Sequence, residues 1–241
     1  MRLPRLVRRA GGAIRRSLSA PGRRRVRREA EETLAASSEK DSRGFQVRRY
    51  RDHTAYVAHQ RAKRERWETG ALAEHDQTFR AVLRERLSGD GPIVPGMAVL
   101  CLGARMGGEV AAFRDLGCFA VGIDLNPGAA NPFVLPGDFH ELPFPAACVD
   151  VVFTNSLDHA SDIDQVLREI HRVLKPSGLL IVEAVRGSAE GVAPKFYESF
   201  FWDSIDDLAR LLTDQGFTLV TRYPFASPWP GEQLCLRKET R

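Results

Sequence analysis

A glycine-rich turn followed by a distant carboxylate is the part of this sequence best equipped for ligand chemistry. Residues 99–110 read VLCLGARMGGEV, and the next apolar run ends at Asp124, about 20 residues beyond the turn. Glycine tolerates positive φ and lets a ligand approach the backbone, and the following helix N-terminus offers unpaired N–H groups. A carboxylate ending the second strand can accept hydrogen bonds from both hydroxyls of a ribose. The pattern predicts a site for an adenosine-containing ligand at the carboxyl edge of an α/β sheet, with a plain strand-to-helix turn as the alternative.

Three ordered segments follow this turn. They are GDFHELPFP at 137–145, VDVVFTN at 149–155 and EIHRVLKPSGLLIV at 169–182. With them, residues 95–185 closely resemble the class I S-adenosylmethionine-dependent methyltransferases, specifically the group called methyltransferase type 11, and the resemblance extends in outline to residue 238. It implies an α/β fold with a Rossmann-like, doubly wound sheet of seven strands, mostly parallel with an antiparallel C-terminal strand pair. It also implies S-adenosyl-L-methionine as the cofactor and methyl transfer to an acceptor that the sequence does not identify.

The resemblance assigns cofactor contacts residue by residue. The turn from Gly103 to Gly107 is expected to lie against the methionine and ribose parts of the cofactor, and Asp124 to bind the ribose hydroxyls. Asp138 would accept a hydrogen bond from the adenine amino group, between Leu125 and Phe139 on the two sides of the ring. The full set of expected contacts is Gly103, Ala104, Arg105, Gly107, Asp124, Leu125, Asp138, Phe139 and Asn155. For the two aspartates the alternative is a helix or turn cap.

Two positions depart from the family pattern. The family usually has an acidic residue where this chain has Cys101, and a glycine where it has Arg105. A thiol cannot pair with the cofactor's ammonium as a carboxylate can. Arg105 either binds the methionine carboxylate through a charge-assisted pair or extends into solvent, and both interpretations stay open.

Transfer from a sulfonium requires alignment and exclusion of water, with a base only where the acceptor is a hydroxyl. Asn155 is expected to line the methyl-donor side of the site. His159, shortly after the fourth strand, is the best-placed candidate for a general base, and His140 is the second. A histidine at the first position is also common in the family without a proven acid–base role. Tyr197 lies on a segment that often covers the acceptor pocket and is a further candidate.

Two rival classes deserve comparison. A nicotinamide-dependent oxidoreductase predicts Gly-x-Gly-x-x-Gly, whose middle glycine is replaced by Arg105 here. The segment that begins with Gly137, Asp138 and Phe139 and the expected antiparallel strand pair also argue against that class. A non-catalytic cofactor-binding or scaffolding protein with a degenerate methyltransferase fold stays open, because Cys101 and Arg105 both alter the cofactor turn.

Charge is divided sharply along the chain. Residues 1–28 hold 11 Arg, no Lys and no acidic residue, so the remainder carries −7 within a net charge of +4. The core therefore gives no strong nucleic-acid signal. The basic arm is consistent with a solvated tail, a transit peptide read by import machinery, contact with an anionic membrane surface, or contact with RNA.

Cysteine usage and hydropathy limit the compartment. No apolar run is long enough to span a bilayer. The four cysteines have neither metal-ligand spacing nor a disulfide pattern, so no metal site is expected and a reducing compartment is favoured. The expected location is cytoplasmic, organellar if residues 1–28 are a transit peptide, or peripheral on a membrane.

The sequence predicts four segments: a basic Arg-rich extension (1–28), a polar linker (29–44), two helices that form a possible lid (45–92) and the methyltransferase core (93–241). Aromatic and polar residues of the third segment could cover the cofactor or, for the aromatics, pack on the sheet; they are Tyr50, Tyr56, His59, Gln60 and Trp67. Seven strands are predicted at 97–102, 119–124, 133–135, 149–155, 179–185, 217–223 and 233–237. Two capped helices are predicted among them, one starting at Ser161 with Asp164 and one at Ser204 with Asp207.

Overall fold

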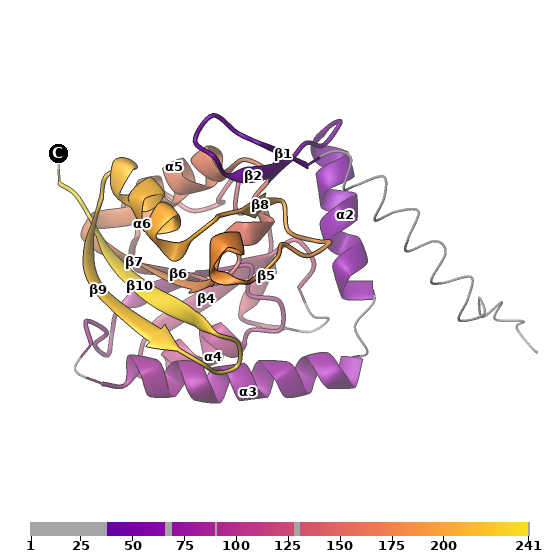
Figure 1. Ribbon diagram of the computed structural model, residues 1–241. Helices are drawn as coiled ribbons and strands as arrows, with labels where there is room; N and C mark the ends of the chain where they lie inside the picture. The colour runs from indigo at the N-terminus through magenta and orange to yellow at the C-terminus, as the bar shows by residue number, and fades with distance from the viewer. Residues whose placement is uncertain (1–37, 66–68, 90, 128–130, 241) are drawn as a thin grey trace, which may run out of the picture. The chain divides into compact units, whose positions relative to one another are not determined.

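A seven-stranded sheet forms the frame of the part of the chain that the structure describes (Figure 1). The computed structural model describes residues 38–65, 69–89, 91–127 and 131–240. The strands are β3 (Ala98–Leu102), β4 (Phe119–Asp124), β5 (Val134–Pro136), β6 (Val149–Thr154), β7 (Leu174–Val185), β9 (Phe217–Phe225) and β10 (Gly231–Lys238). Their order is β5-β4-β3-β6-β7-β10-β9, and β10 runs antiparallel to both of its neighbours. The predicted Rossmann-like sheet with an antiparallel C-terminal pair is confirmed.

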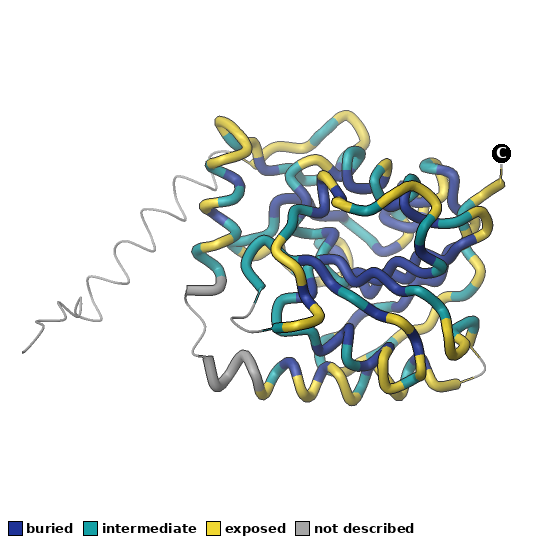
Figure 2. Tube along the Cα trace, turned by 180° about the vertical axis from the view of Figure 1, so that it is seen from behind, coloured by how far each residue is buried: buried dark blue, intermediate teal, exposed yellow. Residues whose placement is uncertain are grey.

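Alternate residues of the central strands are buried on opposite faces of the sheet. The covering helices are α3 (Thr69–Leu87) and α4 (Gly108–Asp115) on one face, and α5 (Ile163–Val173) and α6 (Ile205–Asp214) on the other. Leu100 of β3 packs in the cluster of α5 and α6, whereas Val99 and Cys101 pack in the cluster of α3 and α4. Figure 2 shows the resulting buried centre between more exposed outer surfaces. Continuous apolar strands follow because both faces are covered.

Helix starts agree with the sequence in one case and differ by one residue in the other. Ser204 caps α6 and forms a capping box with Asp207, as predicted. At α5, however, the cap is Asp162, whose carboxylate accepts a hydrogen bond from the Gln165 N–H, and the prediction of Ser161 was wrong. The N–H of Ser161 is instead bound to a histidine ring, described below.

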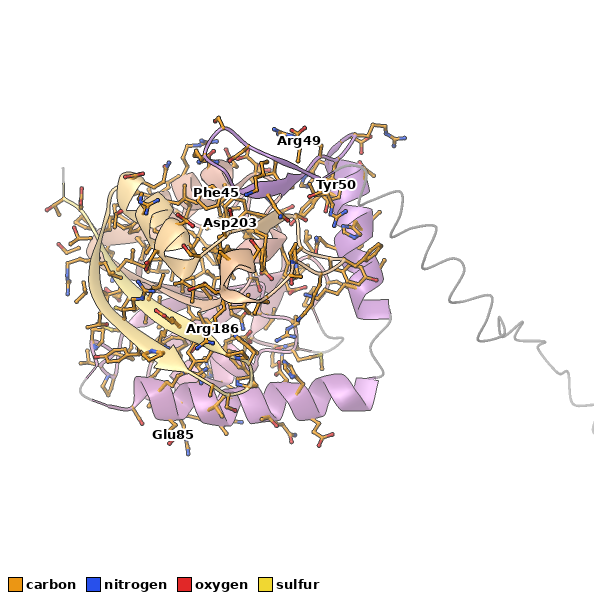
Figure 3. The ribbon with its side chains drawn as sticks, in the orientation of Figure 1. Phe45, Arg49, Tyr50, Glu85, Arg186 and Asp203 are labelled. Carbon is orange, nitrogen blue, oxygen red and sulfur yellow. The ribbon has the colours of Figure 1, made fainter. Side chains whose placement is uncertain are left out.

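Two helices precede the core, α2 (His53–Glu65) and α3, in agreement with the predicted helical pair. A small antiparallel sheet was not expected: β1 (Ser38–Lys40) and β2 (Gln46–Arg48) continue to β8 (Phe200–Phe201). β1 lies within the predicted polar linker. Phe45 is buried against Phe200, with ring centroids 4.9 Å apart, so a long-range contact stabilises a segment without local strand pattern. Phe45 and Tyr50 lie on either side of β2 (Figure 3).

Some predictions concern residues that the structure does not describe. The basic extension, most of the polar linker and Trp67 lie outside the described residues. Among the described helices, none combines the length and the apolar character needed to cross a membrane.

Candidate cofactor and acceptor site

A cavity of about 420 Å³ lies at the carboxyl ends of β3, β4 and β6. This volume is within the usual range for small-molecule sites. Seven of the predicted site residues line it: Gly103, Arg105, Asp124, Leu125, Phe139, Asn155 and His159. Ala104, Gly107 and Asp138 do not. The other lining residues are Tyr56, Gln60, Lys63, His75, Met106, Asn126, Ser156, Asp158, Val185, Lys195, Tyr197, Glu198 and Trp229.

The glycine turn has the backbone geometry that its residues predict. Gly103 has φ +70°, and a Cβ there would lie 2.6 Å from Oγ of Ser156, so only glycine fits. Gly107 has φ +91° and is the N-cap of α4. Between them, buried Ala104 donates its N–H to the Ile123 carbonyl at 3.0 Å, which ties the turn to β4. Ala104 and Gly107 therefore shape the turn from outside the cavity lining.

Asp124 is held in a fixed orientation by two backbone donors. The N–H of Arg105 donates to Oδ2 at 2.9 Å, and the N–H of Asn126 donates to Oδ1 at 2.7 Å. Each carboxylate oxygen retains a further lone pair. Asp124 lines the cavity, so its carboxylate is suitably placed to accept the two hydroxyls of a ribose.

Arg105 keeps the left-handed backbone conformation of the glycine that it replaces, with φ +41°. For a residue with a Cβ this conformation costs about 1–2 kcal/mol. The side chain is half-buried and lines the cavity, and within the described residues no hydrogen bond or ion pair holds its guanidinium. A guanidinium group in this position can bind the carboxylate of a ligand through two parallel hydrogen bonds.

Cys101 faces the layer of α3 and α4 and does not line the cavity, so it offers the cofactor no direct contact. Glu109, in the first turn of α4, is 1% exposed, and neither of its carboxyl oxygens has a hydrogen-bond partner among the described residues. Burial, reinforced by the nearby carboxylate of Asp76, raises the pKa of Glu109 to about 8. Sequence analysis missed this buried acid, although an acidic residue at a helix N-terminus after a glycine turn was a visible signal.

The carboxylate of Asp138 is engaged by histidines and does not line the cavity. Its Oδ1 accepts hydrogen bonds from Nδ1 of His140 at 2.6 Å and from the backbone N–H of that residue at 2.9 Å. Nε2 of His53 lies 3.0 Å from Oδ2. Burial opposes ionisation, but the hydrogen bonds from His140 hold the pKa of Asp138 below its ordinary value. Oδ2 of Asp138 has no hydrogen-bond partner among the described residues, and the adenine contact of Asp138 stays a prediction.

His140 has no spare ring nitrogen. Nδ1 donates to Asp138, and Nε2 accepts from the N–H groups of Ser161 at 3.1 Å and Asp162 at 3.3 Å. The ring stacks on Phe139, with centroids 4.9 Å apart, and so supports the residue expected to flank adenine. His140 does not line the cavity, so the geometry gives it a structural role and not the second-choice base role predicted for it.

His159 lines the cavity, but both of its ring nitrogens are bound. Nδ1 lies 2.9 Å from the Tyr197 carbonyl oxygen, which can only accept, so Nδ1 carries the proton. Nε2 accepts a hydrogen bond from Nζ of Lys63 on α2. Burial, with the neighbouring Lys63 charge, lowers the pKa of His159 well below its ordinary value. The lone pair of this neutral ring is therefore directed at Lys63, a residue that no sequence pattern singled out.

Two carboxylates share the same end of the cavity. Asp158 and Glu198 both line it, and burial raises the pKa of each, with the charge of Asp158 adding to the shift of Glu198. Oδ1 of Asp158 has no hydrogen-bond partner among the described residues, while Glu198 accepts the backbone N–H of Lys195. We call the group of Lys63, Asp158, His159, Lys195, Tyr197 and Glu198 the acceptor end.

The loop from 195 to 199 is fixed between α2 and the core. Gln60 donates its amide to the Tyr197 carbonyl at 2.9 Å, and the hydroxyl of Tyr50 lies 2.6 Å from Oγ of Ser199. Tyr50 also lies 2.8 Å from Nδ1 of His59, whose ring stacks on Tyr197. Of the residues suggested for a lid, Tyr56 and Gln60 line the cavity directly. α2 thus forms one wall of the cavity.

The sheet order and the glycine-turn cavity together define the class I, S-adenosylmethionine-dependent methyltransferase fold. A family model described as a methyltransferase domain matches residues 100–182, which is consistent with this class. S-adenosylmethionine is the cofactor of the class.

Two curated relatives and one solved structure illustrate the likeness. The malonyl-[acyl-carrier protein] O-methyltransferase 1 of Coxiella burnetii (strain RSA 493 / Nine Mile phase I) is 31% identical over 51% of this chain and 47% of its own length. The demethylmenaquinone methyltransferase of Corynebacterium kroppenstedtii is 26% identical over 67% of this chain and 72% of its own length. The chain thus spans about half of the Coxiella relative. The solved structure is that of Burkholderia thailandensis 1,6-didemethyltoxoflavin-N1-methyltransferase with S-adenosylhomocysteine. Its TM-score is 0.62 at 18% identity, and the match covers 85% of this chain and all of the Burkholderia chain. At this identity the likeness supports the fold alone.

Proposed function

We propose that this protein is a methyltransferase that binds S-adenosylmethionine in the cavity and transfers its methyl group to an acceptor held beside α2. The observation that carries the proposal is that the Gly103 turn, the oriented Asp124 carboxylate and the Arg105 guanidinium, which is unpaired within the described residues, line the same cavity. These three features match a ribose and a carboxylate, which are the polar ends of this cofactor.

Each lining residue has a defined task under this proposal. The cofactor supplies a methyl group already activated on a sulfonium, so the protein has to align the acceptor and exclude water. Asp124 binds the ribose, Arg105 binds the methionine carboxylate, and Leu125 and Phe139 enclose the adenine. Asn155, which follows β6 and lines the cavity, contacts the methyl-donor side.

A general base in this site would need a free lone pair. His159 cannot supply one while Lys63 occupies its Nε2, so direct proton removal by His159 requires Lys63 to move. The positions of these groups therefore favour a role for His159 in holding Lys63 and the Tyr197 loop.

The relatives do not settle the acceptor. One is named for malonyl-[acyl-carrier protein] and another for demethylmenaquinone, which are different acceptors. Their names support the reaction class, and the identity of the acceptor here must come from the acceptor end itself or from a screen with a labelled methyl donor.

Calorimetry with S-adenosylhomocysteine tests the proposal. Asp124→Ala should weaken binding by about 1–3 kcal/mol, or roughly 5- to 150-fold, because the ribose hydroxyls lose a charged acceptor. Asp115→Ala is the matched control, since that carboxylate pairs with Arg80 outside the cavity and should leave binding unchanged. Absence of binding to the wild type at millimolar ligand, or equal affinity in Asp124→Ala, would sink the proposal.

A second candidate function is cofactor binding without transfer. The observation that favours it is the strained Arg105 in place of a glycine. The two functions differ in one measurement: a labelled methyl donor incubated with a cell extract yields a protein-dependent labelled product only if the protein is an enzyme.

A further inference from the structure

The cavity is lined by more cationic side chains than the single carboxylate of the cofactor can engage. Lys63, Arg105 and Lys195 all line it, and within the described residues none of the three forms an ion pair with a carboxylate. Three carboxylates also line the cavity: Asp124 accepts two backbone N–H groups, Glu198 accepts one, and Oδ1 of Asp158 has no hydrogen-bond partner among the described residues. The methionine part of the cofactor brings a single carboxylate, which Arg105 on the glycine turn is positioned to bind.

Lys63 is the second cation that lacks an anionic partner. An ammonium group has three donors, and the contact with Nε2 of His159 uses one of them. Burial lowers the pKa of Lys63, with Arg105 acting in the same direction and Asp158, Glu198 and Asp124 opposing it. A partly buried cation whose one hydrogen-bond partner among the described residues is a neutral ring is costly, and an anionic ligand in the cavity would reduce that cost.

We propose, on the basis of the proposed function, that Lys63 binds an oxyanion of the methyl acceptor, and that the acceptor carries a carboxylate or a comparably charged oxygen. Three contacts position the amine. His159 holds Nζ, the ring of His159 is fixed by the Tyr197 carbonyl, and Gln60 of the same helix holds that carbonyl from the other side. Lys63 is thus anchored on the α2 wall and not on the glycine turn.

Every charged group around Lys63 bears on the pH dependence. An anion stabilises the ammonium form, so binding raises the pKa of Lys63 and weakens as pH rises through the pKa of the free protein. Asp158 and Glu198 also lose their protons as pH rises, and their negative charges then repel an anionic acceptor. The side chains of Arg105 and Lys195 attract an anion, Asp124 repels it, and neutral His159 contributes a dipole only. The affinity for an anionic acceptor should therefore fall between mildly acidic and alkaline pH.

Matched carboxylate, amide and amine probes test this on protein saturated with S-adenosylhomocysteine. We would titrate hexanoate against hexanamide and hexylamine, and benzoate against benzamide and benzylamine, and follow binding by NMR. In at least one set the carboxylate should bind roughly tenfold or more tightly than its amide and its amine. Absence of a carboxylate preference in both sets, or a preference for the amines, would overturn the proposal without any variant.

Variants then locate the binding group. Lys63→Met should lose the carboxylate preference by roughly tenfold or more, and Lys63→Arg should recover part of it, because the charge is restored. Lys175→Met is the control, since Lys175 pairs with Asp150 outside the cavity. Carboxylate binding that persists in folded Lys63→Met would overturn the proposal.

A final experiment distinguishes binding of an acceptor anion by Lys63 from binding of the cofactor's own carboxylate. S-adenosylhomocysteine contains the methionine carboxylate, and 5′-methylthioadenosine lacks it. If Lys63→Met weakens the first ligand and spares the second, then Lys63 binds the cofactor carboxylate and the proposal is wrong. If the wild type binds neither ligand, the proposed function itself fails, so the two failures are distinguishable.

Discussion

Arg105 combines backbone strain with a half-buried charge in the cavity lining, and these two properties can be separated experimentally. Arg105→Gly removes the left-handed strain and should raise the free energy of unfolding by about 0.5–1 kcal/mol. The same substitution should weaken S-adenosylhomocysteine roughly tenfold and leave 5′-methylthioadenosine unchanged, because only the first ligand has a carboxylate.

Ala147→Gly is the control for that variant. Ala147 also has positive φ, at +51°, in an exposed loop outside the cavity lining. It should show the gain in stability without a change in either ligand's affinity. Tighter S-adenosylhomocysteine binding in Arg105→Gly would show that the arginine obstructs the site, and equal weakening of both ligands would indicate a disturbed turn.

Glu109 makes stability depend on pH at a single residue. Its pKa rises to about 8 on folding through burial, so the native state holds the proton where the unfolded state loses it. A raised carboxyl pKa means that the contribution is intact below the ordinary value near 4.5 and is lost as pH rises toward about 8. Relative to Glu109→Gln, the wild type should lose up to about 1.4 kcal/mol per pH unit over this range.

Urea unfolding of both proteins at pH 5, 6, 7 and 8 measures this difference. Glu85→Gln controls for the loss of one carboxylate at an exposed position, since Glu85 lies on the outer side of α3 (Figure 3). Parallel stability curves for wild type and Glu109→Gln would contradict a buried, unpaired acid at this position.

At the scale of elements, one buried ion pair connects α3 to the antiparallel edge of the sheet. Arg86 donates to both carboxylate oxygens of Glu183 on β7 at 2.8 Å, and Gln233 of β10 donates to the same carboxylate at 2.9 Å. Arg86 also lies over the ring of Phe225, 4.4 Å from its centroid. Arg86→Ala leaves Glu183 buried without its cation and should cost about 3–5 kcal/mol of unfolding free energy.

The same helix provides the matched comparison. Arg80 makes two hydrogen bonds to Asp115, at 2.6 and 2.7 Å, but this pair is partly exposed. Arg80→Ala should therefore cost only about 0–1 kcal/mol. If chemical denaturation shows equal losses for the two variants, the buried pair does not fix α3 to the sheet.

Elements with a strong local pattern were predictable. The strands follow continuous apolar runs, and α6 begins at its Ser204 cap, because burial on both faces and side-chain capping are written in neighbouring residues. The pairing of β2 with β8 was missed because it joins residues about 150 positions apart, such as Val47 and Phe200, and β1 and β2 have only three residues each. The cap of α5 lies one residue further on: the Ser161 hydroxyl is 3.2 Å from Nε2 of His140, and the Asp162 carboxylate accepts the Gln165 N–H.

The site divides in the same way. The glycine turn and Asp124 were predictable from spacing and the other cofactor contacts from the family resemblance, and seven of the ten predicted site residues line the cavity. Lys63 was not predictable, since it comes from a helix about 40 residues before the turn and is placed by tertiary contacts with His159. The contact of His53 with Asp138 likewise depends on where α2 packs.

At the scale of the whole molecule, the chain joins a basic segment to an acidic body. Residues 1–28 carry 11 arginines and no acidic residue, and the rest of the chain carries −7. These first residues lie outside those that the structure describes, so the prediction depends on charge alone. We propose that they direct the protein to an anionic surface, with no part in cofactor binding.

Deletion of residues 1–28 should abolish binding to vesicles rich in phosphatidylserine while leaving the S-adenosylhomocysteine affinity unchanged. Binding of the full chain should fade with salt, because the screening length shrinks from about 10 Å at 0.1 M to about 3 Å at 1 M. Replacing Arg23, Arg24, Arg25, Arg27 and Arg28 by Gln tests charge without changing chain length and should remove much of the vesicle binding. Cosedimentation measures both effects.

Equal binding to neutral phosphatidylcholine vesicles, or binding that persists at 1 M salt, would show that the attraction is not electrostatic. Altered cofactor affinity in the truncated protein would show that residues 1–28 contribute to the site.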